Sequence, residues 1–206
     1  LTKKKQITEA YKLLAPLNTP LILYTHSQYN PFLFRKDKIL FMLRSVYDTM
    51  VSFYFHNSKH HQRYEKGIKS FIKEPDLGVT RWINYINSWA PRLLSGNCSI
   101  ITYEKLNEES VESVSDVLEF LNIPPDISVI RQALVLSSFE RMKNIEIKNG
   151  IIEHNYDRND NNARRMRKGK IGKYTDFLDS KDVDYINNQC DRYLNIFSKK
   201  LLHKVN

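Results

Sequence analysis

Three short runs of apolar residues have the length and composition of buried β-strands. Residues 20–25 read P-L-I-L-Y-T, residues 38–43 read K-I-L-F-M-L and residues 98–103 read C-S-I-I-T-Y. Continuous apolar runs of about four to eight residues, bounded by turn residues, are typical of strands covered on both faces. We therefore expect three strands of one parallel sheet.

Between these runs, apolar positions recur at the spacing of a helix. One helix is expected directly after the second strand, because Ser45 and Asp48 form a capping-box pattern ahead of a wide apolar face. The same periodicity predicts helices over about residues 8–14, 79–93, 110–121 and 126–136, and one long last helix over about 183–201. The alternation of strand and helix predicts an α/β fold, a three-layer sandwich whose central parallel sheet is flanked by helices.

Length and composition favour one domain over residues 1–206. Hydrophobic residues make up 41% and aromatic residues 12% of the 206, enough for one sizeable core. No apolar run approaches the roughly 18 to 20 residues that a bilayer span requires, so we expect no membrane span. The chain begins at Leu1 with a basic run and no apolar signal segment, which indicates a piece of a longer protein.

Cysteine usage bears on location and on metal sites. Cys98 and Cys190 are the only two cysteines, which excludes a disulfide framework or a four-thiolate zinc site. This usage suits a reducing compartment, so we expect a cytoplasmic protein. His56, His60 and His61 lie close in sequence, but no carboxylate or thiolate falls at ligand spacing, and we expect no metal there.

The formal net charge of +9 could serve a nucleic acid, a membrane surface or a small anion. The informative part is a polar stretch over about 149–173, because loops beyond about 12 to 15 residues are usually functional lids or disordered. Six basic residues of this stretch fall between positions 158 and 170: Arg158, Arg164, Arg165, Arg167, Lys168 and Lys170. A nucleic-acid-binding domain is one alternative function, and it ranks low because no nucleic-acid motif is visible.

Candidate chemistry lies at the ends of the expected strands. Arg44 follows one strand and Ser52 lies on the next helix, so the two could share a phosphate, although Arg44 could instead simply pair with Asp48. In M-R-K-G-K at 166–170, Arg and Lys suit an anion and Gly allows close backbone approach, although such strings are more often solvated. His26 follows another strand and could remove a proton from a hydroxyl, or be a surface residue.

Taken in order, these segments resemble the cytosolic type of sulfotransferase. The resemblance rests on five linked motifs from about residue 20 to 193: T-H at 25–26, L-R-S-V-Y-D-T-M-V-S-F-Y at 43–54, I-T-Y-E-K-L at 101–106, S-S-F-E-R-M-K at 137–143 and M-R-K-G-K-I-G at 166–172. It implies a fold related to nucleotide kinases. It also implies transfer of a sulfuryl group from 3′-phosphoadenosine 5′-phosphosulfate to a hydroxyl or amine of a small-molecule or glycan acceptor.

The resemblance also implies roles for individual residues. His26 matches the general base. The 3′-phosphate ligands are matched by Arg44, Ser52, Arg167, Lys168 and Gly169, and the positions around the nucleotide, most of them beside the adenine, by Tyr103, Ser137, Phe139 and Met166.

Three elements of the family pattern are missing. The loop P-K-S-G-T-T-W, which holds the 5′-phosphosulfate, is absent, Tyr24 stands where a lysine often precedes T-H, and the dimerisation element has no counterpart around 173–182. Homodimerisation is therefore open. A non-catalytic module that binds 3′-phosphoadenosine nucleotides stays as the alternative function.

Overall fold

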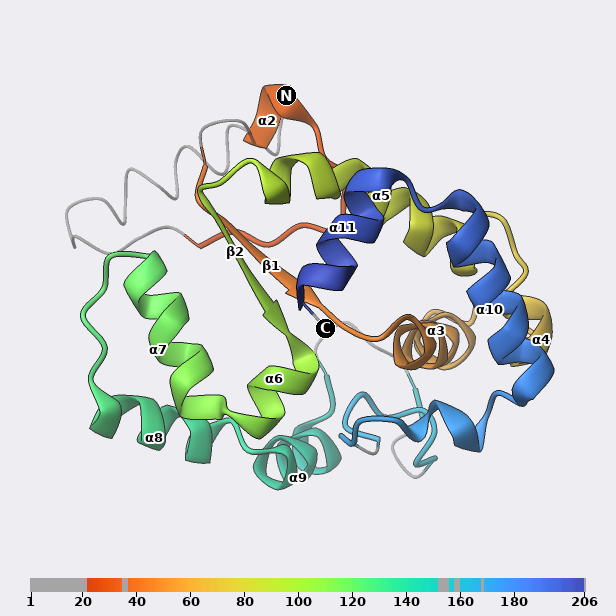
Figure 1. Cartoon of the computed structure of the whole chain (residues 1–206). Helices are drawn as coiled ribbons and strands as arrows, with labels where there is room; N and C mark the ends of the chain where they lie inside the picture. Colours follow the sequence, from red (N-terminus) through yellow and green to blue (C-terminus); the bar gives the residue numbers. More distant parts are fainter. Residues whose placement is uncertain (1–21, 35–36, 152–155, 158–159, 168, 206) are drawn as a thin grey trace.

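The structure is a computed structural model that describes residues 22–34, 37–151, 156–157, 160–167 and 169–205 (Figure 1). Its strands are β1 (Ile39–Leu43) and β2 (Cys98–Thr102). Its helices are α2 (Pro31–Phe34), α3 (Val46–Phe55), η2 (His56–His60), α4 (Ile68–Phe71), α5 (Val79–Leu94), α6 (Tyr103–Glu108), α7 (Ser110–Phe120), α8 (Ile127–Leu136), α9 (Phe139–Asn149), η3 (Lys173–Asp176), α10 (Ser180–Tyr193) and α11 (Ile196–Val205). Among the described residues, no helix is long and apolar enough to cross a bilayer.

The two strands pair in parallel, with Ile39 opposite Cys98 and Leu43 opposite Thr102. Parallel neighbours need a crossover, which here includes α3 and α5. The expected α/β class with a parallel sheet is therefore confirmed. In Figure 1, α7 and α8 lie to one side of the sheet, and α3, α6 and α9 gather below the carboxyl ends of the strands.

The first predicted strand is wrong in its described part. Residues 22–25 have no regular structure, and Ile22 and Leu23 are exposed. An apolar run becomes a strand only where a neighbouring strand and a covering layer bury it, and the described part of the chain supplies neither to these side chains. Residues 20–21, and the helix expected over 8–14, lie outside the described residues.

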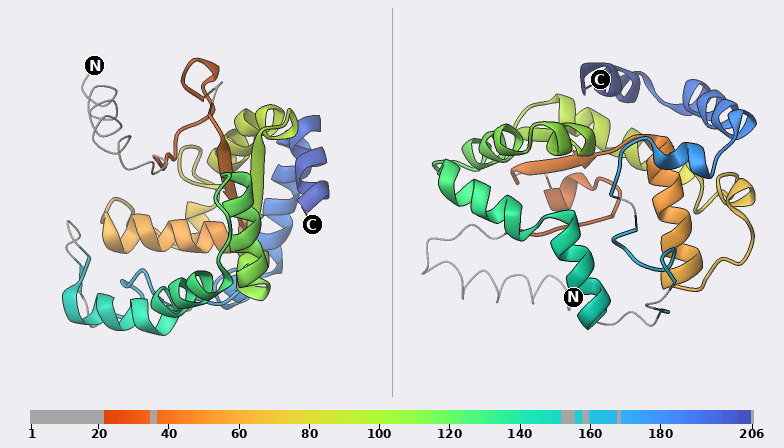
Figure 2. Two further views of the ribbon diagram at one scale, coloured as in Figure 1. Left: turned by 90° about the vertical axis from the view of Figure 1, so that its left-hand side faces the viewer. Right: turned by 90° about the horizontal axis from the view of Figure 1, so that it is seen from below.

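The core forms around α5. Its stripe of Val79, Ile83, Ile86 and Leu93 is buried in one cluster with Phe41 and Leu43 of β1 and with residues of α10 and α11. Each fully buried side chain of this kind contributes roughly 1.5 to 3 kcal/mol. Gly78 precedes the helix, and a Cβ there would lie 2.4 Å from the carbonyl oxygen of Ile72, so no larger residue fits without a shift. Figure 2 shows α10 and α11 side by side with α5, which both contact.

The long last helix is in fact two helices. Leu194 has extended backbone angles, and the Oδ1 of Asn195 accepts a hydrogen bond from Ser198 N at 2.8 Å, which begins α11 anew. Asn87 of α5 fixes the break, because its Oδ1 accepts from Asn195 N at 2.9 Å and from Ser198 Oγ at 2.7 Å. The apolar spacing continues across the break, so the periodicity alone could not reveal it.

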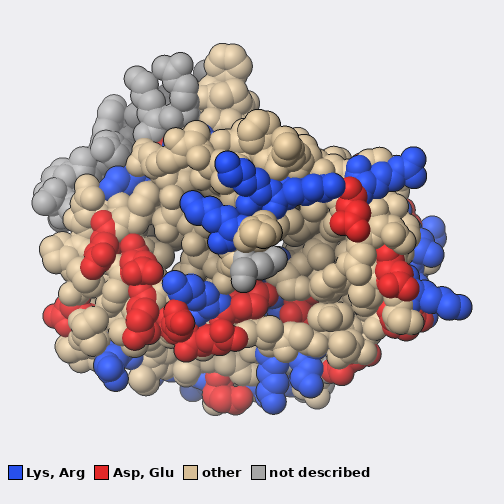
Figure 3. All heavy atoms as spheres, viewed as in Figure 1, with Lys and Arg blue, Asp and Glu red and all other residues tan. Residues whose placement is uncertain are grey.

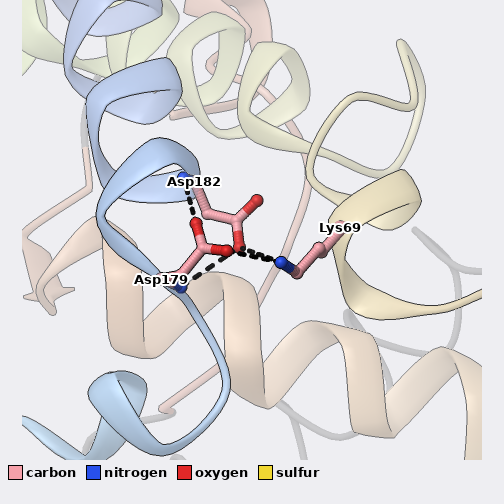
Figure 4. Close-up of polar contacts among 3 residues, drawn as sticks. All are labelled: Lys69, Asp179 and Asp182. Carbon is pink, nitrogen blue, oxygen red and sulfur yellow. Dashed lines mark hydrogen bonds and ion pairs between the residues drawn. The ribbon is translucent and has the colours of Figure 1, made fainter.

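The expected capping box at Ser45 and Asp48 is also wrong. The Ser45 side chain makes no capping hydrogen bond to α3, and its N–H donates to Glu104 Oε1. A capping box occurs instead at the start of α10, where the Asp179 and Asp182 carboxylates each accept a backbone N–H of the other residue. Lys69 of α4 lies 2.5 Å from Asp179 and 3.9 Å from Asp182 and ties the two helices together (Figure 4).

Candidate functional site

A pocket of about 140 Å³ lies where α3, α6, α9 and the basic segment (residues 160–173) meet. α3 follows β1 and α6 follows β2, so the pocket lies at the carboxyl ends of both strands, the usual place for a ligand in such sheets. Its lining includes seven of the residues singled out from the sequence: Arg44, Ser52, Tyr103, Phe139, Met166, Arg167 and Gly169.

Two guanidinium groups face this pocket from different parts of the chain. The Cζ of Arg44 lies 4.3 Å from the centre of the Tyr103 ring, and the Cζ of Arg167 lies 3.8 Å from the centre of the Phe55 ring. Burial, together with the nearby charge of Arg44, lowers the pKa of Arg167 to about 10. Two cations held close together in an aromatic setting favour the binding of an anion between them.

Arg44 is left with hydrogen-bonding capacity. Its Nε is buried and finds no acceptor among the described residues. The Asp48 carboxylate accepts hydrogen bonds from the backbone N–H groups of Gly172 and Tyr174 instead. The alternative that Arg44 simply pairs with Asp48 is therefore wrong. A buried donor without an acceptor costs free energy, which a bound anion would recover.

Asp48 has a different task from the one expected. Its carboxylate is buried and accepts hydrogen bonds from Gly172 N at 2.9 Å and Tyr174 N at 3.1 Å. α3 thus holds the carboxyl end of the basic segment beside the pocket. The pattern of residues around Asp48 did not indicate this contact, since its partners lie more than a hundred positions later.

Gly169 allows the basic segment to approach α9. Its φ is +59°, and a Cβ at this position would lie 2.3 Å from Cδ2 of Phe139. The close approach and the left-handed backbone both require glycine. The Phe139 ring and the backbone of the basic segment therefore form one wall of the pocket.

Two of the described candidates, His26 and Ser137, do not line the pocket. His26 lies in the exposed stretch after residue 22, with its ring 6.1 Å from that of Tyr24. Ser137 is exposed and donates its hydroxyl to Ala133 O at 2.8 Å, which closes α8. Lys168 lies outside the described residues.

The pocket also has lining residues that were not singled out for it. Arg165, Lys170 and Lys173 belong to the basic stretch visible in the sequence, whereas Phe177 follows it. In Figure 3, the Lys and Arg side chains near the middle of the face lie over α11, away from the pocket, with Asp and Glu in a band below them. Within the described residues, no group of three or more His, Cys, Asp or Glu side chains is arranged to hold a metal ion.

The comparisons with known proteins identify the family of this chain. Residues 1–204 match the family model of the sulfotransferase domain. The chain belongs to the sulfotransferase domain family. Sulfotransferase 2A1 of Macaca fascicularis is 25% identical over 82% of the chain, and sulfotransferase 6B1 of Pan troglodytes is 29% identical over 66%. The sulfotransferase chain spans 61% and 48% of these two relatives.

Two solved structures share the fold of this chain. A mouse sulfotransferase, SULT7A1, crystallised with PAP, superimposes with a TM-score of 0.60 at 23% identity, over 81% of this chain and 63% of that one. Retinol dehydratase, in complex with androsterone and the inactive cofactor PAP, superimposes with a TM-score of 0.68 at 16% identity. The superposition covers 94% of this chain and 62% of that one.

Proposed function

We propose that this protein binds 3′-phosphoadenosine 5′-phosphosulfate and transfers its sulfuryl group to a hydroxyl or amine of a small-molecule or glycan acceptor. The observation that carries the proposal is the pair of guanidinium groups, Arg44 and Arg167, in a pocket that also has aromatic walls. The family membership supports it, as do the two similar structures, both of which are complexes with PAP.

In this proposal Arg44, Ser52 and Arg167 bind the 3′-phosphate, with Lys168 and Gly169 from the same motif. Guanidinium groups suit this task because their planar fork matches phosphate oxygens. Tyr103, Phe139 and Met166 contact the nucleotide from the pocket wall, where the two rings are among the aromatic residues. Ser137, which does not line the pocket, contacts the nucleotide only if the end of α8 approaches it in the ligand-bound protein.

The proposed reaction is an in-line displacement at sulfur. The acceptor oxygen loses its proton to His26 and forms a bond to sulfur, while the bond from sulfur to the 5′-phosphate oxygen breaks and adenosine 3′,5′-bisphosphate leaves. Such transfers depend on positioning and on cations that stabilise the developing charge. The role of His26 further requires the exposed stretch around it to reach the acceptor in the ligand-bound protein.

The test is calorimetric binding of adenosine 3′,5′-bisphosphate beside ADP and 5′-AMP. We expect a clear preference for the 3′-phosphorylated nucleotide. Arg167→Ala should weaken its binding about 10- to 150-fold, since a charge-assisted hydrogen bond contributes roughly 1.5 to 3 kcal/mol. Arg131→Ala, on the exposed side of α8, is the matched control and should bind as the wild type does. Equal affinity for the three nucleotides would contradict the proposal.

A second candidate is a module that binds the same nucleotide without catalysing transfer. It is favoured by the position of His26, which lies in an exposed stretch and does not line the pocket. A transfer assay with labelled 3′-phosphoadenosine 5′-phosphosulfate and a panel of phenols, steroids and sugars separates the two, because both candidates bind the nucleotide and only one forms a product. A cytoplasmic location remains part of the proposal, on the grounds of cysteine usage.

A further inference from the structure

We propose that Glu146 is a positioning residue, which holds Arg165 and Met166 of the basic segment against the pocket before any anion binds. The ligand half of this inference rests on the proposed function. The anchoring half concerns this chain alone and can be measured without a nucleotide.

Glu146 lies on α9 and is 4% exposed. Its Oε1 accepts hydrogen bonds from Tyr156 Oη at 2.6 Å and from Arg165 N at 2.7 Å, and its Oε2 accepts one from Met166 N at 2.8 Å. One carboxylate therefore fixes two consecutive peptide groups that immediately precede Arg167.

The carboxylate is suited to this because it stays ionised. Burial by itself raises the pKa of Glu146, but the hydrogen bonds from Tyr156, Met166 and Arg165, together with the nearby His60, outweigh burial and lower the pKa. Hydrogen bonds from N–H groups to an ionised carboxylate are about twice as strong as neutral ones. The contact is thus a firm attachment of the basic segment to α9.

The face of α9 that carries Glu146 also carries Phe139, two helical turns earlier. Phe139 packs against Gly169, so α9 contacts the segment on both sides of Arg167. Asp48 of α3 holds the far end through Gly172 and Tyr174. Arg167 lies between these attachments and has little freedom to leave the pocket.

This attachment opposes a repulsion. The charge of Arg44 contributes to the lowered pKa of Arg167, so the two guanidinium groups disfavour each other when no anion lies between them. Glu146 is not among the pocket-lining residues and cannot bind the anion itself. Its effect on affinity must pass through the position of Arg167.

The first experiment is hydrogen–deuterium exchange on the ligand-free protein. Glu146→Gln keeps the shape of the side chain but replaces one carboxylate oxygen by an amide N–H₂ group. That group cannot accept a hydrogen bond from a peptide N–H. We expect several-fold faster exchange of the amides of residues 160–170, with α5 unchanged. Glu119→Gln, an exposed carboxylate on α7, is the matched control. Unchanged exchange in Glu146→Gln overturns the anchoring.

The second experiment measures binding of adenosine 3′,5′-bisphosphate. If Glu146→Gln leaves Arg167 in its binding position in only about a tenth of the molecules, the apparent affinity for the nucleotide falls about tenfold. In a double-mutant cycle, Glu146→Gln should add almost nothing to Arg167→Ala, whereas a merely structural role gives additive losses. Additive losses, or wild-type affinity in the single variant, overturn the inference. Glu146→Asp, which keeps the carboxylate, should recover part of the affinity.

Two further results keep the proposals separable. If the wild-type protein does not bind the nucleotide but Glu146→Gln still speeds exchange in residues 160–170, the proposed function is wrong and the anchoring holds. If Glu146→Gln does not fold, Tyr156→Phe removes one of the hydrogen bonds to the carboxylate and should raise exchange in the same segment by a smaller factor. No increase in that variant contradicts the anchoring.

Discussion

At the scale of single residues, the site depends on a contact that tolerates no added atom. Gly169→Ala places a Cβ against the Phe139 ring and in a left-handed backbone conformation, so the basic segment must move away from α9. We expect weaker binding of adenosine 3′,5′-bisphosphate by about tenfold or more, measured by calorimetry. Gly96→Ala is the control, since Gly96 also has positive φ (+93°) but no atom lies within 4 Å of its Cβ position. Equal affinities in the two variants would exclude the contact as a determinant of binding.

The residues around the pocket differ in how far the sequence alone reveals them. Arg44 and Arg167 could be predicted because each residue type has a direct use for an anion and lies at a recognisable position. Glu146 could not, because a carboxylate on an amphipathic helix is ordinarily a solvated residue, and its partners are peptide N–H groups about twenty positions later. Residues that act through the backbone leave no pattern of their own in the sequence.

At the scale of elements, the sequence predicts a helix correctly where residues close together in the chain determine it. The helix α8 begins where Asp126 accepts hydrogen bonds from Ser128 N and Val129 N, and α5 has the stripe that its sequence indicates. The predictions failed where a distant partner decides. Asn87 of α5 interrupts the last helix at Asn195, more than a hundred residues away, and Asp48 binds the backbone at Gly172 instead of capping its own helix.

The side chain of Asn195, at the break between α10 and α11, should contribute measurably to the free energy of unfolding. Asn195→Ala removes the N-cap of α11 and should lower the free energy of unfolding by about 1 kcal/mol, measured by denaturant titration. Nucleotide affinity should not change, because the break lies among the helices around α5 and not at the pocket. Asn188→Ala, on the exposed part of α10, is the control and should change stability little. A loss of affinity in Asn195→Ala would show that the two regions are coupled.

At the scale of the whole molecule, the net charge of +9 matters through its distribution. Arg44, Arg165, Arg167, Lys170 and Lys173 line the pocket, and Asp48, which is engaged with backbone N–H groups, is the acidic residue among the lining. Cations that converge on one place raise the local concentration of an anionic ligand, and dissolved salt screens that attraction over about 10 Å at 0.1 M.

Binding should therefore weaken with salt in proportion to the phosphate charge that the pocket holds. Between about 0.05 and 0.5 M salt we expect the dissociation constant of adenosine 3′,5′-bisphosphate to rise on the order of tenfold. The constant of 5′-AMP, which lacks the 3′-phosphate, should rise by a smaller factor. In Arg167→Ala the two nucleotides should become more alike, because one of the groups that recognises the additional phosphate is gone. Identical salt dependence of both nucleotides in the wild-type protein would mean that the basic segment acts as a general positive surface and not as a phosphate site.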